Sequence, residues 1–146
     1  MTFSASLVAV GDSYHNKGEK FENGNWSDIQ EPPVNERFMG YAVIFHGGDH
    51  FFFGGFDGSN YLDSIFRLSG SSWTWSNVGQ LNSVRRGHGV ILANNKFTVV
   101  GGDGNQKNEA CLLDNEQFTC TELSSSLNGY RWWPILHLVD ENYGTC

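Results

Sequence analysis

Proline, cysteine and basic residues are scarce in this chain of 146 residues, which has 3, 3 and 9 of them against 16 acidic residues. Three cysteines are too few for a disulfide scaffold, and no histidines stand at a spacing that would complete a metal site with them. The formal net charge is −7 and no basic stripe is present, which argues against nucleic acid as a partner. We therefore expect a domain that holds no metal and no cofactor and binds no nucleic acid.

Long apolar runs are also missing from the sequence. No stretch approaches the ~18 consecutive apolar residues of a membrane-spanning helix, which argues against a membrane partner. Residues 1–10 have no basic start and too short an apolar run for a secretion signal. We expect a soluble chain whose compartment stays open, with the cytoplasm slightly favoured over an extracellular location.

Aromatic residues and glycine, by contrast, are abundant, with an aromatic share of 14% and 18 glycines. Many aromatics together with many glycines are typical of short strands joined by tight turns. No apolar run shows helical periodicity of any length. The composition and the pattern predict an all-β fold.

The chain also repeats. Residues 26–29, 75–78 and 120–123 each begin with a large apolar residue and end with an aliphatic one. Eleven positions after the start of each stretch stands an arginine, so that the arginines are 49 and then 45 residues apart. These arginines are Arg37, Arg86 and Arg131. The repeat divides a single domain into residues 1–36 (partial), 37–85, 86–130 and 131–146 (partial).

Each unit reads as four short antiparallel strands. An apolar run follows the arginine, a turn follows the run, and a second strand ends in paired glycines, as in residues 51–55. Two further strands complete the unit, for which we expect residues 65–68 and 73–76. Asn23-Gly24 between extended segments indicates a hairpin, because both residues tolerate positive φ. A four-stranded unit of about 45–50 residues is the period of a propeller blade.

The best unit resembles the kelch repeat in its Gly54-Gly55 pair, Tyr61, Trp75 and Arg86. The next unit keeps Gly101-Gly102 but has Cys120 at the tryptophan position. The resemblance implies a kelch-type β-propeller fragment, with two complete blades flanked by incomplete ones. Three blades are fewer than the ~4 of closed rings, so a fragment, an open stack and a ring completed by another chain stay open. Open edges favour self-association.

The same resemblance implies a non-catalytic module that presents loops to another protein or an acidic peptide. Its expected contacts are Arg37, Arg86, Arg131, His88 and Trp132. The alternative for the arginines is that each bonds the carbonyls of its own loop. The alternative function is a piece of a secreted or carbohydrate-acting propeller, supported by the aromatic content and the sequon at residues 25–27.

Cys111 and Cys120 lie opposite each other if the chain turns at Asn115-Glu116, which predicts either a disulfide or simple burial. The matching pair of the preceding unit is Phe66 and Trp75, both expected in the core. Further expected core residues are Ile44, Phe52, Leu92 and Val99. His46 and His50 flank a turn without a third metal ligand, and no nucleophile motif or phosphate loop is present.

Overall fold

The computed structural model describes residues 7–11, 15–103 and 107–138, and these residues form eleven strands and no helix. The strands are β1 (Leu7–Val10), β2 (Gly18–Glu22), β3 (Asn25–Asp28), β4 (Ala42–His46), β5 (Asp49–Phe56), β6 (Tyr61–Leu68), β7 (Trp75–Gln80), β8 (Gly89–Ala93), β9 (Lys96–Val100), β10 (Lys107–Asp114) and β11 (Gln117–Ser126). The predicted all-β class is confirmed. None of the described residues belongs to a helix long and apolar enough to span a bilayer.

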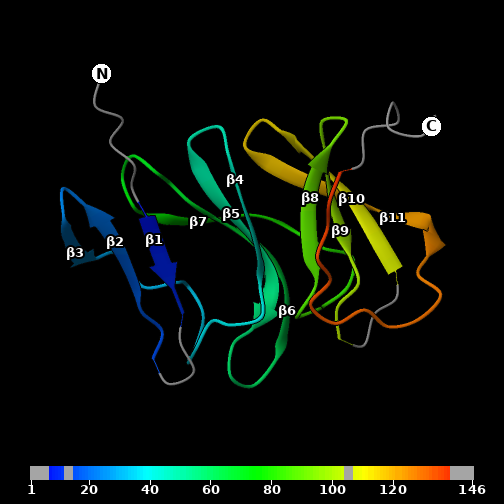
Figure 1. Ribbon diagram of the computed structural model, residues 1–146, viewed down its shortest axis with the longest axis horizontal. Helices are drawn as coiled ribbons and strands as arrows, with labels where there is room; N and C mark the ends of the chain where they lie inside the picture. The colour runs from blue at the N-terminus through cyan, green and yellow to red at the C-terminus, as the bar shows by residue number, and fades with distance from the viewer. Residues whose placement is uncertain (1–6, 12–14, 104–106, 139–146) are drawn as a thin grey trace, which may run out of the picture.

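Three antiparallel sheets follow one another along the chain (Figure 1). The first has the order β1-β2-β3, the second β4-β5-β6-β7 and the third β8-β9-β10-β11. Each sheet is a meander because its strands are joined by short turns with positive φ, such as Asn23-Gly24 (52° and 82°) and Asn94-Asn95 (49° and 60°). The architecture is that of propeller blades, with two four-stranded sheets beside a three-stranded one.

The core lies between the sheets rather than within any one of them. Between the second and third sheets, Phe51 and Phe53 of β5 meet Phe97 of β9 and Phe118 of β11. The ring centroids of Phe118 lie 5.3 Å from those of Phe51 and Phe53 and 5.0 Å from that of Phe97. We call these four residues the phenylalanine cluster. One face of each blade is therefore buried only by its neighbour.

A second cluster lies between the first and second sheets. Its buried members are Phe38, Phe52, Phe66 and Leu68, and Val8, Val10 and Trp75 are among the residues that pack against them. The predicted core is confirmed: Phe52 and Val99 are buried, and Ile44, Leu92 and Trp75 pack against the two clusters.

The strand register agrees with the predicted register in the third blade and differs from it in the second. Cys111 pairs with Cys120 around the turn at Asn115-Glu116, as predicted. Phe66, however, pairs with Asn77, while Trp75 pairs with Leu68. The turn before Trp75 takes up six residues, 69–74, instead of the four expected. Trp73, expected in the strand, lies in this turn with a φ of 57°.

The structure also corrects which residues of successive repeats are equivalent. Gly40, Gly87 and Trp133 share a positive φ of 64°, 61° and 53° and are 47 and 46 residues apart. The Gly87 N–H donates to the Gly40 carbonyl (2.7 Å), and the Trp133 N–H donates to the Gly87 carbonyl (2.6 Å). We call this chain of bonds the repeat ladder. In this alignment Arg86 corresponds to Met39 of the repeat before and to Trp132 of the repeat after. Arg37, Arg86 and Arg131 therefore do not occupy equivalent positions, contrary to the prediction.

The apolar run after Arg131 was also expected to form a strand. Residues 132–138 form none, because no other strand lies alongside to pair with them in the described structure. The repeat also predicts a turn after this run, at residues 140–142, which lie outside the described residues.

Candidate functional site

Arg86 lies at the centre of a group of aromatic side chains. Its guanidinium carbon is 4.8 Å from the ring centroid of Tyr61, 5.2 Å from that of Phe56 and 5.6 Å from that of Trp132. These distances are within the range of cation–π attraction. The rings come from the end of β5, the start of β6 and the segment after β11. The fold thus brings residues that are far apart in the sequence together around one cation.

Asp103 holds this group together. Its Oδ2 accepts a hydrogen bond from the Tyr61 hydroxyl (2.7 Å) and one from Arg86 Nη2 (3.3 Å). The bond to Asp103, assisted by burial, raises the pKa of Tyr61, so the phenol keeps its proton as a donor. We call Phe56, Tyr61, Arg86, Asp103 and Trp132 the Arg86 cluster. Arg86 remains about a quarter exposed and Trp132 about half exposed, so both are accessible to a ligand.

An apolar pocket of about 350 Å³ adjoins the Arg86 cluster. It is lined by Val10, Gly11, Phe38, Met39, Gly40, Tyr41 and Trp133. Gly40 joins the pocket to the cluster, because a Cβ at this position would lie only 3.1 Å from the Cβ of Arg86. The Tyr41 hydroxyl donates to the Val10 carbonyl and fixes the pocket wall. A charged, aromatic surface and an apolar hollow are therefore continuous.

The other predicted arginines lie elsewhere. Arg37 is half-buried and its N–H donates to the Asp57 carbonyl (3.1 Å). Arg131 is exposed and its Nη1 donates to the Tyr130 carbonyl (3.1 Å), which is the loop-bonding role weighed as an alternative. Of the predicted contact residues, the structure brings Arg86 and Trp132 together.

His88, also expected to contact a partner, is buried and faces the interior. Burial, together with the positive charge of Arg85, lowers its pKa to about 3, so the ring is neutral near pH 7. A side chain in this position cannot contact a partner at the surface. This assignment is corrected.

The sequence analysis missed Arg85, which is fully buried. Its Nη2 donates to the Glu109 carboxylate (2.5 Å), and its Nη1 donates to the carbonyls of Gly101 (3.1 Å) and Lys107 (2.8 Å). Its own carbonyl accepts from the Gly55 N–H of the preceding blade (2.8 Å). The sequence offered one signal, since Glu109 directly precedes the apolar run at residues 110–113 and a carboxylate buried with that run requires a paired partner.

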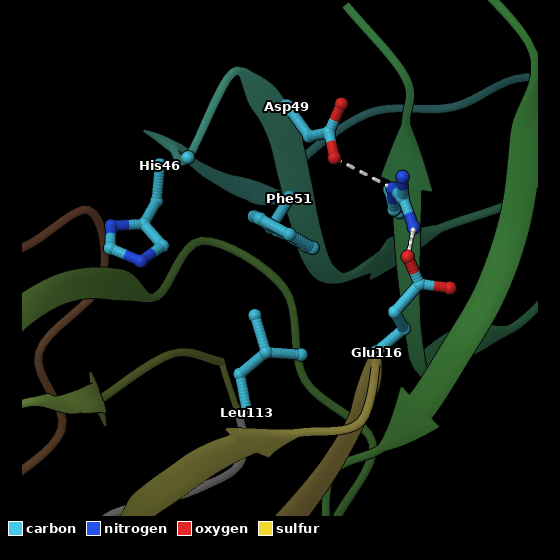
Figure 2. A pocket seen from close by; sticks show the side chains of 7 residues that line it. His46, Asp49, Phe51, Leu113 and Glu116 are labelled. Carbon is cyan, nitrogen blue, oxygen red and sulfur yellow. Dashed lines mark ion pairs between the residues drawn. The ribbon is translucent and has the colours of Figure 1, made fainter.

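A second pocket, of about 230 Å³, opens between the turn that follows β4 and the turn that precedes β11. Figure 2 shows its labelled residues converging from these two blades. Arg67 is paired with Asp49 (2.8 Å) and with Glu116 (3.1 Å), so its charge is already balanced within the protein. In the described part of the chain, no three His, Cys, Asp or Glu side chains gather as metal ligands.

Comparison with known proteins points to one kind of protein. No protein-family model matches the chain. Kelch-like protein 21 of Rattus norvegicus is 28% identical over 85 residues, which are 58% of this chain and 14% of that protein. The Homo sapiens protein of the same name is 27% identical over 86 residues, with 59% and 14% covered. The match thus spans about one seventh of the length of these relatives.

The fold is shared more widely than the sequence. The solved structure of YjhT superposes with a TM-score of 0.67 over 86% of this chain and 49% of its own, at 12% sequence identity. This likeness concerns the fold alone. In its repeat and sheet order the chain is an array of β-propeller blades, and in sequence it is similar to kelch-like proteins.

Proposed function

We propose that the chain is a non-catalytic module that binds another protein through the Arg86 cluster and the adjoining pocket, with residues 37–85 and 86–130 as its complete blades. The observation that carries the proposal is the half-exposed Trp132 ring beside the Arg86 guanidinium, which pairs with Asp103 through Nη2 and stays about a quarter exposed in the described part of the chain. Arginine and tryptophan are the residue types that dominate protein interfaces.

The Arg86 cluster and the adjoining pocket favour a partner segment that carries a carboxylate next to an apolar side chain. The guanidinium of Arg86 has further N–H donors for a carboxylate. The pocket beside Gly40 offers room for an apolar side chain. Kelch-like relatives agree with a protein partner, although their match covers a small part of their length.

The test uses a fluorescein-labelled peptide of alternating glutamate and leucine, with a lysine–leucine peptide as the comparison. Binding to the glutamate peptide should weaken about tenfold in the Arg86→Ala variant, equivalent to loss of a charged hydrogen bond. Arg37→Ala is the matched control and should bind within about twofold of the wild type, as it lies outside the cluster. Equal binding of both peptides, or no effect of Arg86→Ala, would refute the proposal.

A second candidate, carbohydrate binding, is favoured by the exposed rings of Trp132 and Trp133. Sugar stacking uses the ring faces and needs no cation. Trp132→Ala would then abolish binding to an oligosaccharide array while Arg86→Ala left it intact. The protein-binding proposal expects both variants to weaken peptide binding and no oligosaccharide to be bound.

A further inference from the structure

One motif of the sequence lies outside the proposed binding site. Asn25-Trp26-Ser27 has the form Asn-x-Ser with a middle residue other than proline, which is the acceptor pattern of N-linked glycosylation. Of the 14 asparagines in the chain, only Asn25 stands two residues before a serine or threonine. Whether such a motif can be used depends on where the fold places it.

The fold places this motif at an exposed end of the first sheet. Asn25 is the first residue of β3, directly after the Asn23-Gly24 turn. Among the described strands β3 pairs only with β2, and Figure 1 shows it at the outer edge of the first sheet. All four residues of β3 are exposed. A Cβ added at Gly24 would have no atom within 4 Å, so the space beside the turn is open.

Asn25 and Ser27 lie on the same side of β3, because residues two apart on a strand share a face. Ser27 is opposite Lys20 of β2, and Lys20 is opposite Val8 of β1. Val8 packs against the core between the first and second sheets, so this side of β3 is turned toward the second blade. Trp26 lies on the other side. The exposure of the acceptor amide and the hydroxyl therefore does not depend on what covers the face of Trp26.

The two functional groups of the motif are available for reaction. Asn25 Nδ2 donates to the Asn23 carbonyl at 3.3 Å, in an exposed bond within the turn. A side-chain amide has two N–H groups, so this bond leaves one of them to solvent. Within the described ranges of the chain, the Ser27 hydroxyl bonds no other group. Both groups can thus enter the site of a modifying enzyme without breaking the fold.

A second observation, independent of the motif, concerns the compartment in which the chain folds. Cys111 and Cys120 form a disulfide in the third sheet. Disulfides form and persist on the export route and outside the cell, and they are rare in the cytosol. The enzymes that modify Asn-x-Ser motifs act on exported chains. The buried disulfide and the exposed motif therefore indicate the same route.

We propose that Asn25 is an N-glycosylation site and that the chain folds in an oxidising compartment of the export route. The donor is an oligosaccharide linked to a polyprenyl diphosphate. Asn25 Nδ2 forms a bond to C1 of the first sugar, the bond from C1 to the diphosphate oxygen breaks, and the diphosphate leaves with that electron pair. The amide gives one proton to a base of the transferase, and nothing is oxidised or reduced.

The first experiment expresses the full chain in cultured human cells behind a cleavable signal sequence and measures its intact mass in the medium and in the cell membranes. We expect a mass above 16.3 kDa that falls back to this value after treatment with peptide N-glycosidase. Asn25→Gln and Ser27→Ala should each have the mass of the unmodified chain, whereas Ser27→Thr keeps the hydroxyl and should keep the glycan. Asn128→Gln is the matched control, since Asn128 is exposed but outside the motif, and it should stay glycosylated.

The second experiment tests the exposed position of the site. The glycosidase should release the glycan from the native protein as completely as from the urea-denatured protein, because Asn25 lies beside open space. Release converts Asn25 to aspartate, which mass spectrometry detects in the tryptic peptide of residues 21–37. The same peptide, prepared from the protein of its natural source, should show the same conversion.

The proposal is overturned by a wild type that is unmodified in both fractions, or by a glycan that Asn25→Gln leaves in place. An unmodified peptide 21–37 from the natural source would refute it as well. Release that requires denaturation would contradict the exposed position of Asn25. A glycosylated chain in which Cys111 and Cys120 both react with iodoacetamide before reduction would separate the site from an oxidising compartment and refute that part.

Discussion

Arg85 joins the second and third blades through hydrogen bonds to both. It lies in the connection between β7 and β8, its side chain binds Glu109 of the third blade, and its carbonyl binds Gly55 of the second. Both side chains are withdrawn from water almost completely. A buried ion pair of this kind adds little net stability when intact, but removing one partner leaves an uncompensated buried charge.

Glu109→Gln should therefore lower the free energy of unfolding by about 3–5 kcal/mol, as measured by urea denaturation. Glutamine keeps the shape but replaces one of the two acceptor oxygens by an NH2 group, so the loss reports the missing charge together with a hydrogen bond that Arg85 or Asn82 donates to Glu109. Lys107→Gln removes the exposed pair between Lys107 and Glu122 and should cost less than about 1 kcal/mol. Equal effects of the two substitutions would show that the buried pair has no special role.

His88 predicts how stability depends on pH. Its pKa is lowered from 6.5 to about 3 in the folded chain, so between these values the unfolded chain binds a proton that the folded chain does not. The free energy of unfolding should fall as the pH drops from about 6.5 toward 3, by at most about 1.4 kcal/mol per unit from this residue. His88→Gln should flatten this slope. The measurement is urea denaturation at a series of pH values.

At the scale of strands and hairpins, the β10–β11 hairpin is joined by a disulfide between Cys111 and Cys120. The two residues face each other in the register and are packed against the phenylalanine cluster. The bond closes a short loop, with a sequence separation of 9. Such a bond constrains the unfolded chain and keeps the two strands of the hairpin in register.

Reduction of this bond should lower the free energy of unfolding by about 2–3 kcal/mol in the chain-entropy account. Urea denaturation with and without a phosphine reductant measures the difference. Cys146→Ser should keep the effect, and the double substitution Cys111→Ala with Cys120→Ala should abolish it. If the double variant remained sensitive to the reductant, another bond would be responsible.

The hairpins were predictable because their turns are local. Asn23-Gly24 and Asn115-Glu116 set the register of their strands through residues adjacent in sequence. The mispairing of Phe66 with Trp75 came from a turn whose length depends on Trp73, which takes a positive φ that a tryptophan rarely adopts. The alignment of arginines failed because the connections between blades differ in length. Neither feature leaves a local pattern in the sequence.

At the scale of the whole molecule, each blade buries an apolar face on the next. The phenylalanine cluster takes two members from the second blade and two from the third. Arg86 and Trp132 were predicted as contact residues, but their meeting with Tyr61 was not, since these three side chains come together only once the blades are stacked. Repeat arrays gain much of their stability at such interfaces.

Phe118→Ala should lower the free energy of unfolding by about 3–5 kcal/mol, from lost burial and the cavity that remains. Trp26, Trp73 and Trp75 lie in the first two blades, so in a background that carries Trp132→Phe and Trp133→Phe the fluorescence reports on those blades. The fluorescence midpoint in urea should therefore shift together with the far-UV circular dichroism midpoint. A fluorescence midpoint unchanged by Phe118→Ala would mean that the blades unfold independently.

The repeat ladder gives the array a polarity. Every bond in it runs from the N–H of a later repeat to the carbonyl of the one before, at Gly40, Gly87 and Trp133. A unit that extends the array before Gly40 must present a carbonyl there, and a unit added after Trp133 must present an N–H. Blades can therefore extend or close the array only in one direction. Two arrays of this kind can join head to tail but never head to head.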